Sequence, residues 1–578
     1  MTEREALARR IDMAAGRIPV DTLITNCKVV DVFSQTIFES SVAIGDGKIV
    51  GFGEYKAEKI IDAKNGYLMP GLIDGHVHIE SSVVSPAQFA KCVLPYGTTT
   101  IIADPHEIAN VCGLEGIRYM LDASKDLPLN VRIMLPSCVP ATPFENSGAT
   151  LGAKELSELI DHEGVHGLAE VMNFPGVINS DPSVLDKIDM ATSHGLLSDG
   201  HSPGLTGQDL IAYAAAGIKT DHECSSVQEM EERIRLGMYV LIREGSATKD
   251  LRTLAKGLTD ANYRRCVFCT DDREPADIIA NGHINKNLKI AVEEGIDALQ
   301  AITIGTLNAA ECYGLKSKGA IAPGYDADIM IVRDLTQFEV SHVFTNGEQI
   351  AENGTLLVEP QELVRDTVRD TVNISDINLD DLKLKLSSNN VRTIHVIPDT
   401  VLTESVTKKV ILDEEGCFNA QQNKGLAKIA VVERHNATGN VGLGIFENYH
   451  IENGAIATTI AHDSHNIVVA GDNDEDMLVA INDLKEIGGG ITLVRDGKVL
   501  GHLSLPIAGL MSDQPAQEVA TKMEELLTLA KEFNINPKLQ PFMTLSFMSL
   551  PVIPALKLTD GGLFDVTTFS FVPVEIED

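Results

Sequence analysis

One short stretch decides how this chain folds: Met69-Pro70-Gly71-Leu72-Ile73-Asp74-Gly75-His76-Val77-His78. An apolar run follows a Pro-Gly turn, which is typical of a buried strand, and the run ends in two histidines. Because side chains alternate faces along a strand, His76 and His78 project the same way. Two like-facing imidazoles suit one metal ion, although an isolated pair can also be two histidines on a half-buried strand. The stretch therefore predicts a metal-binding strand whose further ligands lie elsewhere in the chain.

Downstream of this strand, apolar strand-like segments alternate with helical periodicity. Ser85-Pro86 begins one helix, with Ser as N-cap and Pro in the first turn. Ser225 and Gln228 have the spacing of a capping box that begins another helix, ending near Gly237. Repeated strand–helix alternation predicts an α/β fold, a (β/α)8 TIM-like barrel. Its eight expected strands are residues 72–78, 99–103, 131–135, 165–170, 196–201, 218–222, 239–242 and 266–271.

The segments on either side of the barrel predict a small β-sandwich. Short strands fill residues 20–68, and further strand-like residues follow between 319 and 347. A polar, acidic stretch then leads to a C-terminal α+β region with strands at 428–433 and 467–470 and one clear helix at 516–533. The expected domains are 1–68 (N-terminal helix and first part of the small β domain), 69–315 (barrel), 316–360 (second part of the small β domain), 361–390 (linker) and 391–578 (C-terminal α+β domain).

The composition narrows the class of function. The 578 residues include 47 basic and 83 acidic side chains, a net charge of −36. Such a chain is poorly suited to nucleic acid or to an anionic membrane surface, both of which require a basic face. Nine cysteines without paired spacing fit a reduced, cytoplasmic protein, and no apolar run is long enough to span a membrane. We therefore expect neither a nucleic-acid nor a membrane partner.

Polar residues recur where the expected barrel strands end, which is where barrel active sites lie. They are His76, His78, Glu170, His201, His222 and Asp271. Each has an ordinary alternative: Glu170 as a solvated strand end, the later histidines as core residues, and Asp271 as a helix cap that leaves Asp272 as the working carboxylate. Together, four imidazoles and two carboxylates suit two divalent ions that share a bridging group and activate a water molecule. Without a thiolate, the set accepts Mn, Fe or Zn alike.

Longer motifs around these residues resemble the amidohydrolase superfamily and, within it, the adenine deaminase family. The resemblance covers essentially the whole chain, including a C-terminal third that most amidohydrolases lack. Its motifs are Pro70-Gly71-Leu72-Ile73-Asp74-Gly75-His76-Val77-His78-Ile79-Glu80-Ser81-Ser82, residues 104–110, 168–173, 199–201, 220–223 and 269–273 in the barrel, and Ala461-His462-Asp463-Ser464-His465-Asn466-Ile467 near the C-terminus.

This resemblance implies a purine-salvage reaction, in which adenine is hydrolysed to hypoxanthine and ammonia by a hydroxide that bridges two metal ions and attacks C6. It implies that His76, His78 and Asp271 bind the more buried ion, that His201 and His222 bind the second, and that Glu170 bridges them. Mn(2+) or Fe(2+) and a homodimer are expected by the same resemblance, with Zn(2+) as an alternative metal. Asp271 is expected to accept the water proton and pass it toward the leaving amine.

Other residues near the expected rim have open roles. Glu107 and Glu80 are candidate proton donors to the purine ring, and either could instead steady a metal-binding histidine. His462 and His465 could reach the rim, hold a further ion or lie on a surface loop of a separate domain. Asp104 and His106 are open in the same way.

Three rival functions can be weighed on the sequence. An N-acetylglucosamine-6-phosphate deacetylase would share the scaffold but would need cations for a phosphate, for which Arg243 and Arg273 are available. A cytidine-type zinc deaminase is disfavoured, because Arg265 stands where its Pro-Cys motif requires proline. A non-catalytic amidohydrolase-like assembly protein is disfavoured by the presence of all six candidate ligands.

Overall fold

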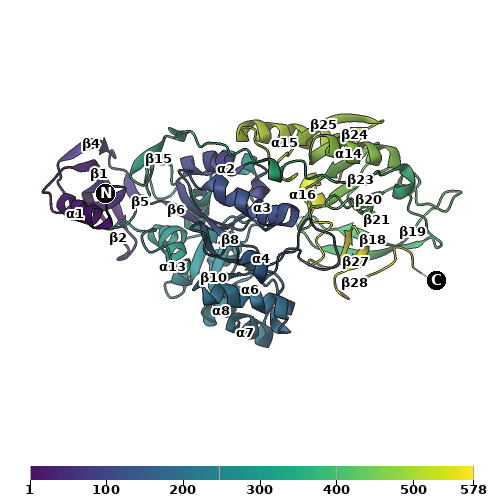
Figure 1. The fold of residues 1–578 in the computed structure, drawn as a ribbon, viewed down its shortest axis with the longest axis horizontal. Coiled ribbons are helices and arrows are strands. Elements are labelled where there is room, and N and C mark those ends of the chain that lie inside the picture. The colour runs from purple at the N-terminus through teal and green to yellow at the C-terminus, as the bar shows by residue number, and fades with distance from the viewer. Residues whose placement is uncertain (1, 247, 399, 577–578) are drawn as a thin grey trace.

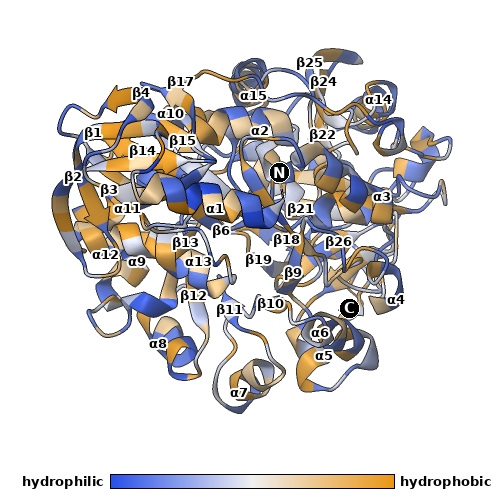
Figure 2. Cartoon of the chain, turned by 60° about the vertical axis from the view of Figure 1, so that its left-hand side comes forward, coloured by the Kyte–Doolittle hydropathy of each residue, from blue (hydrophilic) through white to orange (hydrophobic). Residues whose placement is uncertain are grey.

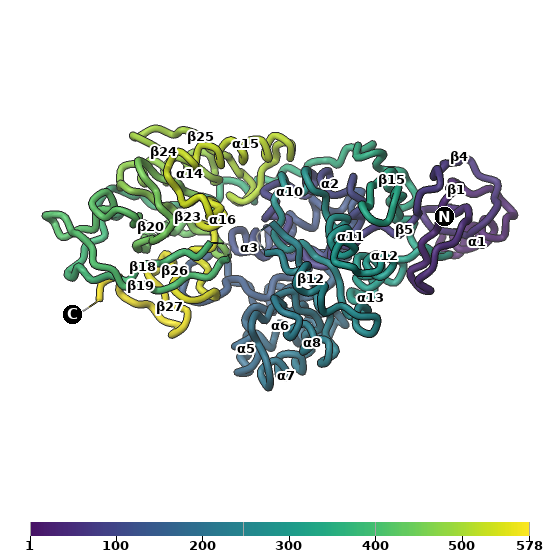
Figure 3. Tube along the Cα trace, turned by 180° about the vertical axis from the view of Figure 1, so that it is seen from behind, coloured from purple at the N-terminus to yellow at the C-terminus, as the bar shows by residue number. Residues whose placement is uncertain are grey.

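The computed structural model describes residues 2–246, 248–398 and 400–576. Three regions follow one another along the longest axis: a small sheet at the N-terminal end, a barrel in the middle and a sheet-rich region at the C-terminal end (Figures 1 and 3). No helix within the described part of the chain is long and apolar enough to cross a membrane.

The predicted barrel strands are confirmed, and all of them are parallel. They are β6 (Leu72–Val77), β7 (Thr98–Ala103), β8 (Asn130–Leu135), β9 (Val165–Val171), β10 (Leu197–Gly200), β11 (Thr220–Asp221), β12 (Tyr239–Arg243) and β13 (Cys266–Cys269). β6 to β10 pair in order as one sheet, and β11 to β13 as another. Parallel bridges join the two sheets at both seams, Ser198 with Ile218 and Val77 with Asp271.

The second seam is the one that matters for the site. The backbone N–H of Asp271 donates to the carbonyl of His76 at 3.0 Å, and the N–H of His78 donates to the carbonyl of Asp271 at 3.2 Å. These bonds pair the ends of β6 and β13. They therefore fix the side chain of Asp271 beside those of His76 and His78, which lie almost 200 residues earlier in the sequence.

Helices cover the outside of the barrel. α2 (Pro86–Val93) begins as predicted, with the Ser85 hydroxyl accepting from the N–H of Gln88, and α3 is His106–Ser124. The later helices include α6 (Pro182–Ser193), α7 (Gly207–Ala215), α8 (Val227–Arg235) and α11 (Ile284–Glu293). The predicted capping box of α8 is wrong by one residue: Ser226 and Glu229 form it, because the Glu229 carboxylate accepts from the backbone at both Ser225 and Ser226.

The segments that flank the barrel in sequence meet in one nine-stranded sheet. Its strands are β1 (Val20–Asp31), β2 (Thr36–Gly45), β3 (Lys48–Phe52), β4 (Ala57–Asp62), β5 (Tyr67–Pro70), β14 (Ile329–Val332), β15 (Val340–Thr345), β16 (Glu348–Glu352) and β17 (Thr355–Leu356). β5 pairs antiparallel with β14, which ties the entry of the barrel to its exit. α1 (Glu3–Ala14) packs on this sheet through Met13. Figure 2 shows hydrophobic strands here beneath a largely hydrophilic α1.

The C-terminal region is built on an eight-stranded sheet in the order β19-β18-β21-β20-β23-β22-β24-β25. These strands are β18 (Asn390–Val396), β19 (Thr403–Lys409), β20 (Leu426–Val432), β21 (Val441–Glu447), β22 (Ala455–Thr458), β23 (Ile467–Gly471), β24 (Gly490–Arg495) and β25 (Lys498–Ser504). A second sheet holds β26 (Leu556–Thr559), β27 (Gly562–Asp565) and β28 (Ser570–Phe571). The predicted helix is α15 (Ala516–Ala530), and the short α16 (Pro541–Ser546) follows it.

The longer of the helices not predicted in this region is α14 (Asp474–Glu486). It packs on β22, β23 and β24 through Met477, Ala480, Ile481 and Leu484. The helical spacing of these four residues is present in the sequence, but charged residues surround them.

The C-terminal region is not loosely tethered to the barrel. The connecting residues 357–389 contain only short 3-10 turns, yet Val368 and Leu382 are fully buried. The N–H of Ala508 also donates to the carbonyl of Val368 at 2.7 Å. A single apolar core extends from barrel residues such as Phe268 to C-terminal residues such as Leu545. Burial of this surface holds the two regions together.

The close approach of β10 to β11 gives a test of the barrel. A Cβ at Gly200 would lie 2.1 Å from the carbonyl oxygen of Thr220. We expect Gly200→Ala to lower the free energy of unfolding by about 1–3 kcal/mol, because backbone must shift to relieve the clash. Gly444→Ala in β21 is the control, since its Cβ would make only ordinary contacts from 3.4 Å. Urea denaturation curves with equal midpoints for the two variants would contradict the packing described.

Candidate active site

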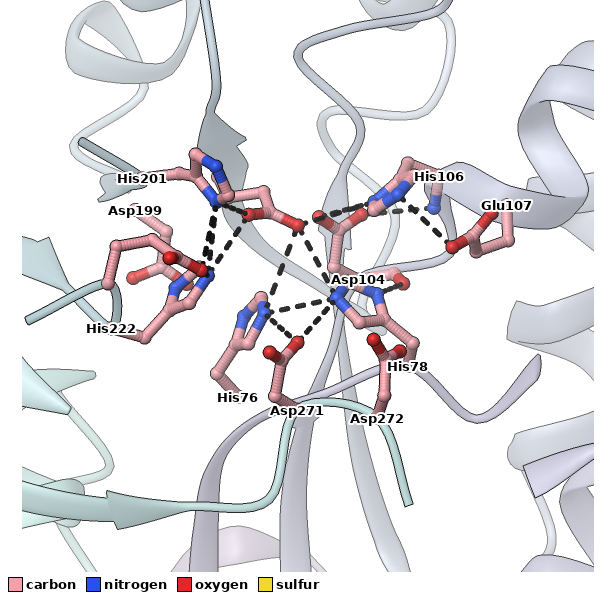
Figure 4. A network of polar contacts seen from close by, with 12 residues as sticks. His76, His78, Asp104, His106, Glu107, Asp199, His201, His222, Asp271 and Asp272 are labelled. Atoms are coloured by element: carbon pink, nitrogen blue, oxygen red, sulfur yellow. Dashed lines mark hydrogen bonds and ion pairs between the residues drawn. The ribbon is translucent and has the colours of Figure 1, made fainter. Parts of the chain in front are cut away.

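Six side chains that the sequence predicts as ligands meet at the carboxyl ends of β6, β9, β10, β11 and β13 (Figure 4). All are buried except His201, whose side chain is 18% exposed. They form two groups that share Glu170, one on each of its carboxylate oxygens.

The first group surrounds Oε1 of Glu170. His78 Nε2 lies 3.4 Å from this oxygen and 3.2 Å from Oδ1 of Asp271. His76 Nε2 lies 3.9 Å from the same Glu170 oxygen, 3.5 Å from Asp271 Oδ1 and 3.2 Å from His78 Nε2. Bonds of about 2.1 Å to a tetrahedral ion place ligand atoms about 3.4 Å apart. The spacing of these four atoms therefore fits one divalent ion between them.

The second group surrounds Oε2 of Glu170. His201 Nδ1 lies 2.7 Å from this oxygen, and His222 Nε2 lies 3.2 Å from it. The two imidazole nitrogens are 3.2 Å apart. Glu223 Oε1 completes the group, 3.7 Å from His201 Nδ1 and 3.5 Å from His222 Nε2. A second divalent ion fits this set of nitrogen and oxygen atoms.

The pKa values of Glu170 and His76 favour the unprotonated forms that bind a metal ion, whereas neighbouring carboxylates raise the pKa values of His78, His201 and His222, which would lose a proton on binding metal. Burial would raise the pKa of Glu170, but His201 and His222 outweigh it and hold that pKa well below the usual range. Burial, with the charge of His222 stacked at 4.2 Å, lowers the pKa of His76 to about 4. His78 Nδ1 lies 3.0 Å from the backbone carbonyl of Asp104. Since a carbonyl only accepts, Nδ1 carries the hydrogen and Nε2 presents its lone pair to the cluster.

Two residues that sequence reasoning left without a role here are Glu223 and Arg243. Arg243 ends β12, pairs with Glu223, and approaches Asp271 Oδ2 to 2.9 Å and Asp250 Oδ2 to 3.1 Å. Arg243 therefore holds the carboxylates of Glu223 and Asp271 in place by ion pairing. Functional residues of barrel enzymes lie at the carboxyl ends of the strands. Arg243 is the last residue of β12, so this rule could have identified it from the sequence.

The structure also places the residues whose roles were open. Asp104 Oδ2 lies 3.1 Å from His106 Nδ1, which in turn lies 3.5 Å from Glu170 Oε1. Asp272 accepts a hydrogen bond from the Ser81 hydroxyl at 2.5 Å. His106 thus lies beside the first group of ligands, and Asp272 lies next to His78 and Asp271 of that group (Figure 4).

Glu107 contacts the C-terminal region directly. Its two oxygens meet His462 Nδ1, at 2.5 Å, and His465 Nε2. His465 Nδ1 accepts the N–H of Ala461 at 3.1 Å, so its Nε2 carries the hydrogen and donates it to Glu107. A histidine whose second nitrogen already accepts a hydrogen bond is a poor metal ligand. This geometry favours a rim contact over a further ion for His465, although Glu107, His462 and His465 are close enough together to hold one.

Glu80 differs from Glu107 in having a free oxygen. Its Oε1 accepts the N–H of Ile108 at 3.2 Å, while Oε2 is buried without a hydrogen-bond partner among the described residues. Burial raises the pKa of Glu80 to about 7, although nearby backbone and His78 oppose the rise.

An eight-stranded barrel with histidines and carboxylates at its strand ends defines the class of metal-dependent hydrolases, and residues 67–350 match the amidohydrolase family model. Residues 400–570 match the adenine deaminase C-terminal domain. An adenine deaminase of Nitratidesulfovibrio vulgaris is 58% identical over all of both chains. Adenine deaminase 2 of Carboxydothermus hydrogenoformans is 48% identical, covering 98% of this chain and 99% of its own. The chain belongs to the adenine deaminase family.

Among solved structures, a β-aspartyl dipeptidase of Fervidobacterium islandicum covers 58% of this chain and 98% of its own, at 17% identity and a TM-score of 0.46. The amidohydrolase match implies a divalent-metal site, and the histidine–carboxylate groups around Glu170 lie inside the matched residues.

Arg243 provides a test of the electrostatics. Arg243→Gln would leave Glu223 and Asp271 buried without their shared cation, so we expect the free energy of unfolding of the metal-free protein to fall by about 3–5 kcal/mol. The control is Arg235→Gln, whose side chain is 71% exposed and pairs with Glu231. That variant should change stability by less than about 0.5 kcal/mol. Similar urea midpoints for both variants would show that Arg243 does not hold the cluster.

Proposed function

We propose that this chain hydrolyses adenine to hypoxanthine and ammonia at the cluster around Glu170. The proposal depends on the position of the Glu170 carboxylate: one of its oxygens faces His76 and His78, and the other faces His201 and His222. Full-length similarity to curated adenine deaminases supports the substrate. A homodimer and a cytoplasmic location stay predictions.

The two groups would hold two divalent ions, with Glu170 bridging them. His76, His78 and Asp271 complete the first site, and His201 and His222 the second. When bound, such ions lower the pKa of a water molecule and polarise the group that it attacks. Imidazole and carboxylate ligands without thiolate suit Mn(2+), Fe(2+) or Zn(2+) alike, and the family resemblance favours Mn(2+) or Fe(2+).

Asp271 is the residue proposed to move the proton. Its Oδ1 faces the two histidines of β6, and its Oδ2 is held by Arg243 at 2.9 Å. A carboxylate held in this way can take the proton of the attacking water and return it to the amine as that group leaves C6.

Attack at C6 also places negative charge on the ring, so a donor near the ring nitrogens would help. Of the two carboxyl groups predicted for this task, Glu107 has both oxygens occupied by His462 and His465, whereas Oε2 of Glu80 is unpartnered. We therefore assign the task to Glu80 and a structural role to Glu107.

The phosphate-dependent rival finds less support. Arg243, a cation that it would need, is already shared among Glu223, Asp250 and Asp271. Arg273 is buried and lies 3.4 Å from Asp277.

The direct test is a pair of assays on one preparation. The purified chain is reconstituted separately with Mn(2+), Fe(2+) and Zn(2+), and ammonia release and the absorbance of adenine are followed. We expect one ammonia for each hypoxanthine formed. Acetate release from N-acetylglucosamine-6-phosphate, without ammonia release from adenine, would refute the proposal in favour of the rival.

The role of Asp271 makes a second prediction. An Asp271→Ala enzyme that retains its metal should lose about 10²–10⁴-fold in kcat, because the proton has no carrier. Metal analysis by mass spectrometry accompanies the kinetics, and Asp260→Ala, an exposed position, is the control. A kcat within tenfold of the parent enzyme at equal metal content would rule out the proton transfer assigned to Asp271.

A further inference from the structure

A cavity lies between the barrel rim and the C-terminal region, next to the cluster. The barrel contributes Ser81, Asp272 and Arg273 to its wall. A carboxylate oxygen of Asp272 lies within 4.8 Å of ligating atoms of both His78 and Asp271. Asp272 therefore connects the wall of the cavity with the first of the two proposed metal sites.

The C-terminal region supplies the opposite wall. Most of its side chains there are apolar: Ile460, Ile491, Met523, Phe542, Met543 and Phe547. The polar members of this wall are Thr458, Ser546 and His462. The His462 ring stacks on that of Phe547 with centroids 4.5 Å apart and planes at 23°. A mostly apolar pocket with a few placed polar groups is typical of a small-molecule site.

His462 is held in one orientation. Its Nδ1 donates to Glu107 at 2.5 Å, and its backbone N–H donates to the carbonyl of Ser546 at 2.9 Å. No described residue forms a hydrogen bond with its Nε2. This nitrogen is therefore the one left for a ligand in the cavity that the ring lines.

Phe547 is also fixed from behind. The fully buried Lys557 donates to the carbonyl of Phe547 at 3.0 Å and to that of Val401 at 2.9 Å. The buried Arg434 donates to the carbonyls of His465, three residues after His462, and, at 3.0 Å, of Ala508. Lys557 thus holds the backbone at Phe547, and Arg434 holds the backbone of the segment that carries His462.

Adenine matches the chemistry of this cavity. It is flat and stacks on aromatic side chains, its ring nitrogens accept hydrogen bonds, and its amino group donates them. Phe547 offers an aromatic face, Asp272 an acceptor and His462 a nitrogen.

We propose that this cavity binds the adenine ring, with Phe547 contacting its face and His462 Nε2 donating a hydrogen bond to a ring nitrogen. The inference rests on the proposed function and extends it, because it makes the C-terminal region part of the substrate site. Burial opposes a charge on His462, but Glu107, Asp272 and Asp463 raise the pKa of His462 to about 9, which leaves Nε2 with a hydrogen to donate.

The experiment separates the two nitrogens of His462. Asn can place its amide near the position of Nδ1, so His462→Asn keeps the contact with Glu107 and removes Nε2. We expect kcat/KM for adenine to fall at least tenfold with metal content unchanged. The control is His502→Asn, because His502 also meets a carboxylate through Nδ1, that of Asp483 at 3.2 Å, but is exposed. Its kcat/KM should stay within twofold of the parent enzyme.

The aromatic wall is tested with Phe547→Ala, which should raise the KM for adenine about tenfold or more and raise the inhibition constant of hypoxanthine in parallel. Phe547→Leu fills most of the same space without an aromatic face, and it serves if the alanine variant does not fold. If the parent enzyme deaminates adenine and these variants and His462→Asn stay within twofold of it, the inference is wrong. If the parent enzyme does not deaminate adenine, the proposed function itself is wrong.

Discussion

Backbone pairing between the end of β6 and Asp271, two residues beyond β13, is the constraint on which the site depends. The two hydrogen bonds between His76, His78 and Asp271 close one seam of the barrel and, by the same geometry, bring two imidazoles and a carboxylate within 3.5 Å of one another. Strands fix side chains more firmly than loops do, because ladder bonds set both position and facing. The proposed catalytic arrangement is therefore a consequence of barrel closure rather than an addition to it.

Burial of so many charges has a cost that pairing offsets. Glu170, Glu223 and Asp271 are removed from solvent together, and carboxylates in such surroundings require cations or hydrogen-bond donors. Arg243 serves two of them, and the histidines approach the rest. On one side, Glu107 extends the network into the C-terminal region through His462 and His465, so the second half of the chain is electrostatically part of the barrel rim.

The barrel strands and the six proposed ligands could be predicted from the sequence, because period-two alternation and strand ends are local signals. The contact between Glu107 and His462 could not, since it joins residues 355 apart in the chain and leaves no periodicity behind. The task of Arg243 also escaped prediction, because a charge pair is visible only when its partners are placed. The shift of the α8 capping box to Ser226 shows a smaller limit: the sequence does not tell which of two adjacent serine hydroxyls accepts the N–H of Glu229.

The central claim is that Glu170 bridges two divalent ions. Anomalous diffraction from crystals of the Mn(2+)-reconstituted protein, recorded above and below the manganese absorption edge, tests it most directly. We expect two peaks, one among His76, His78, Asp271 and Glu170 and the other among His201, His222 and Glu170. A map without a peak beside Glu170, or with the metal only at other residues, would contradict it.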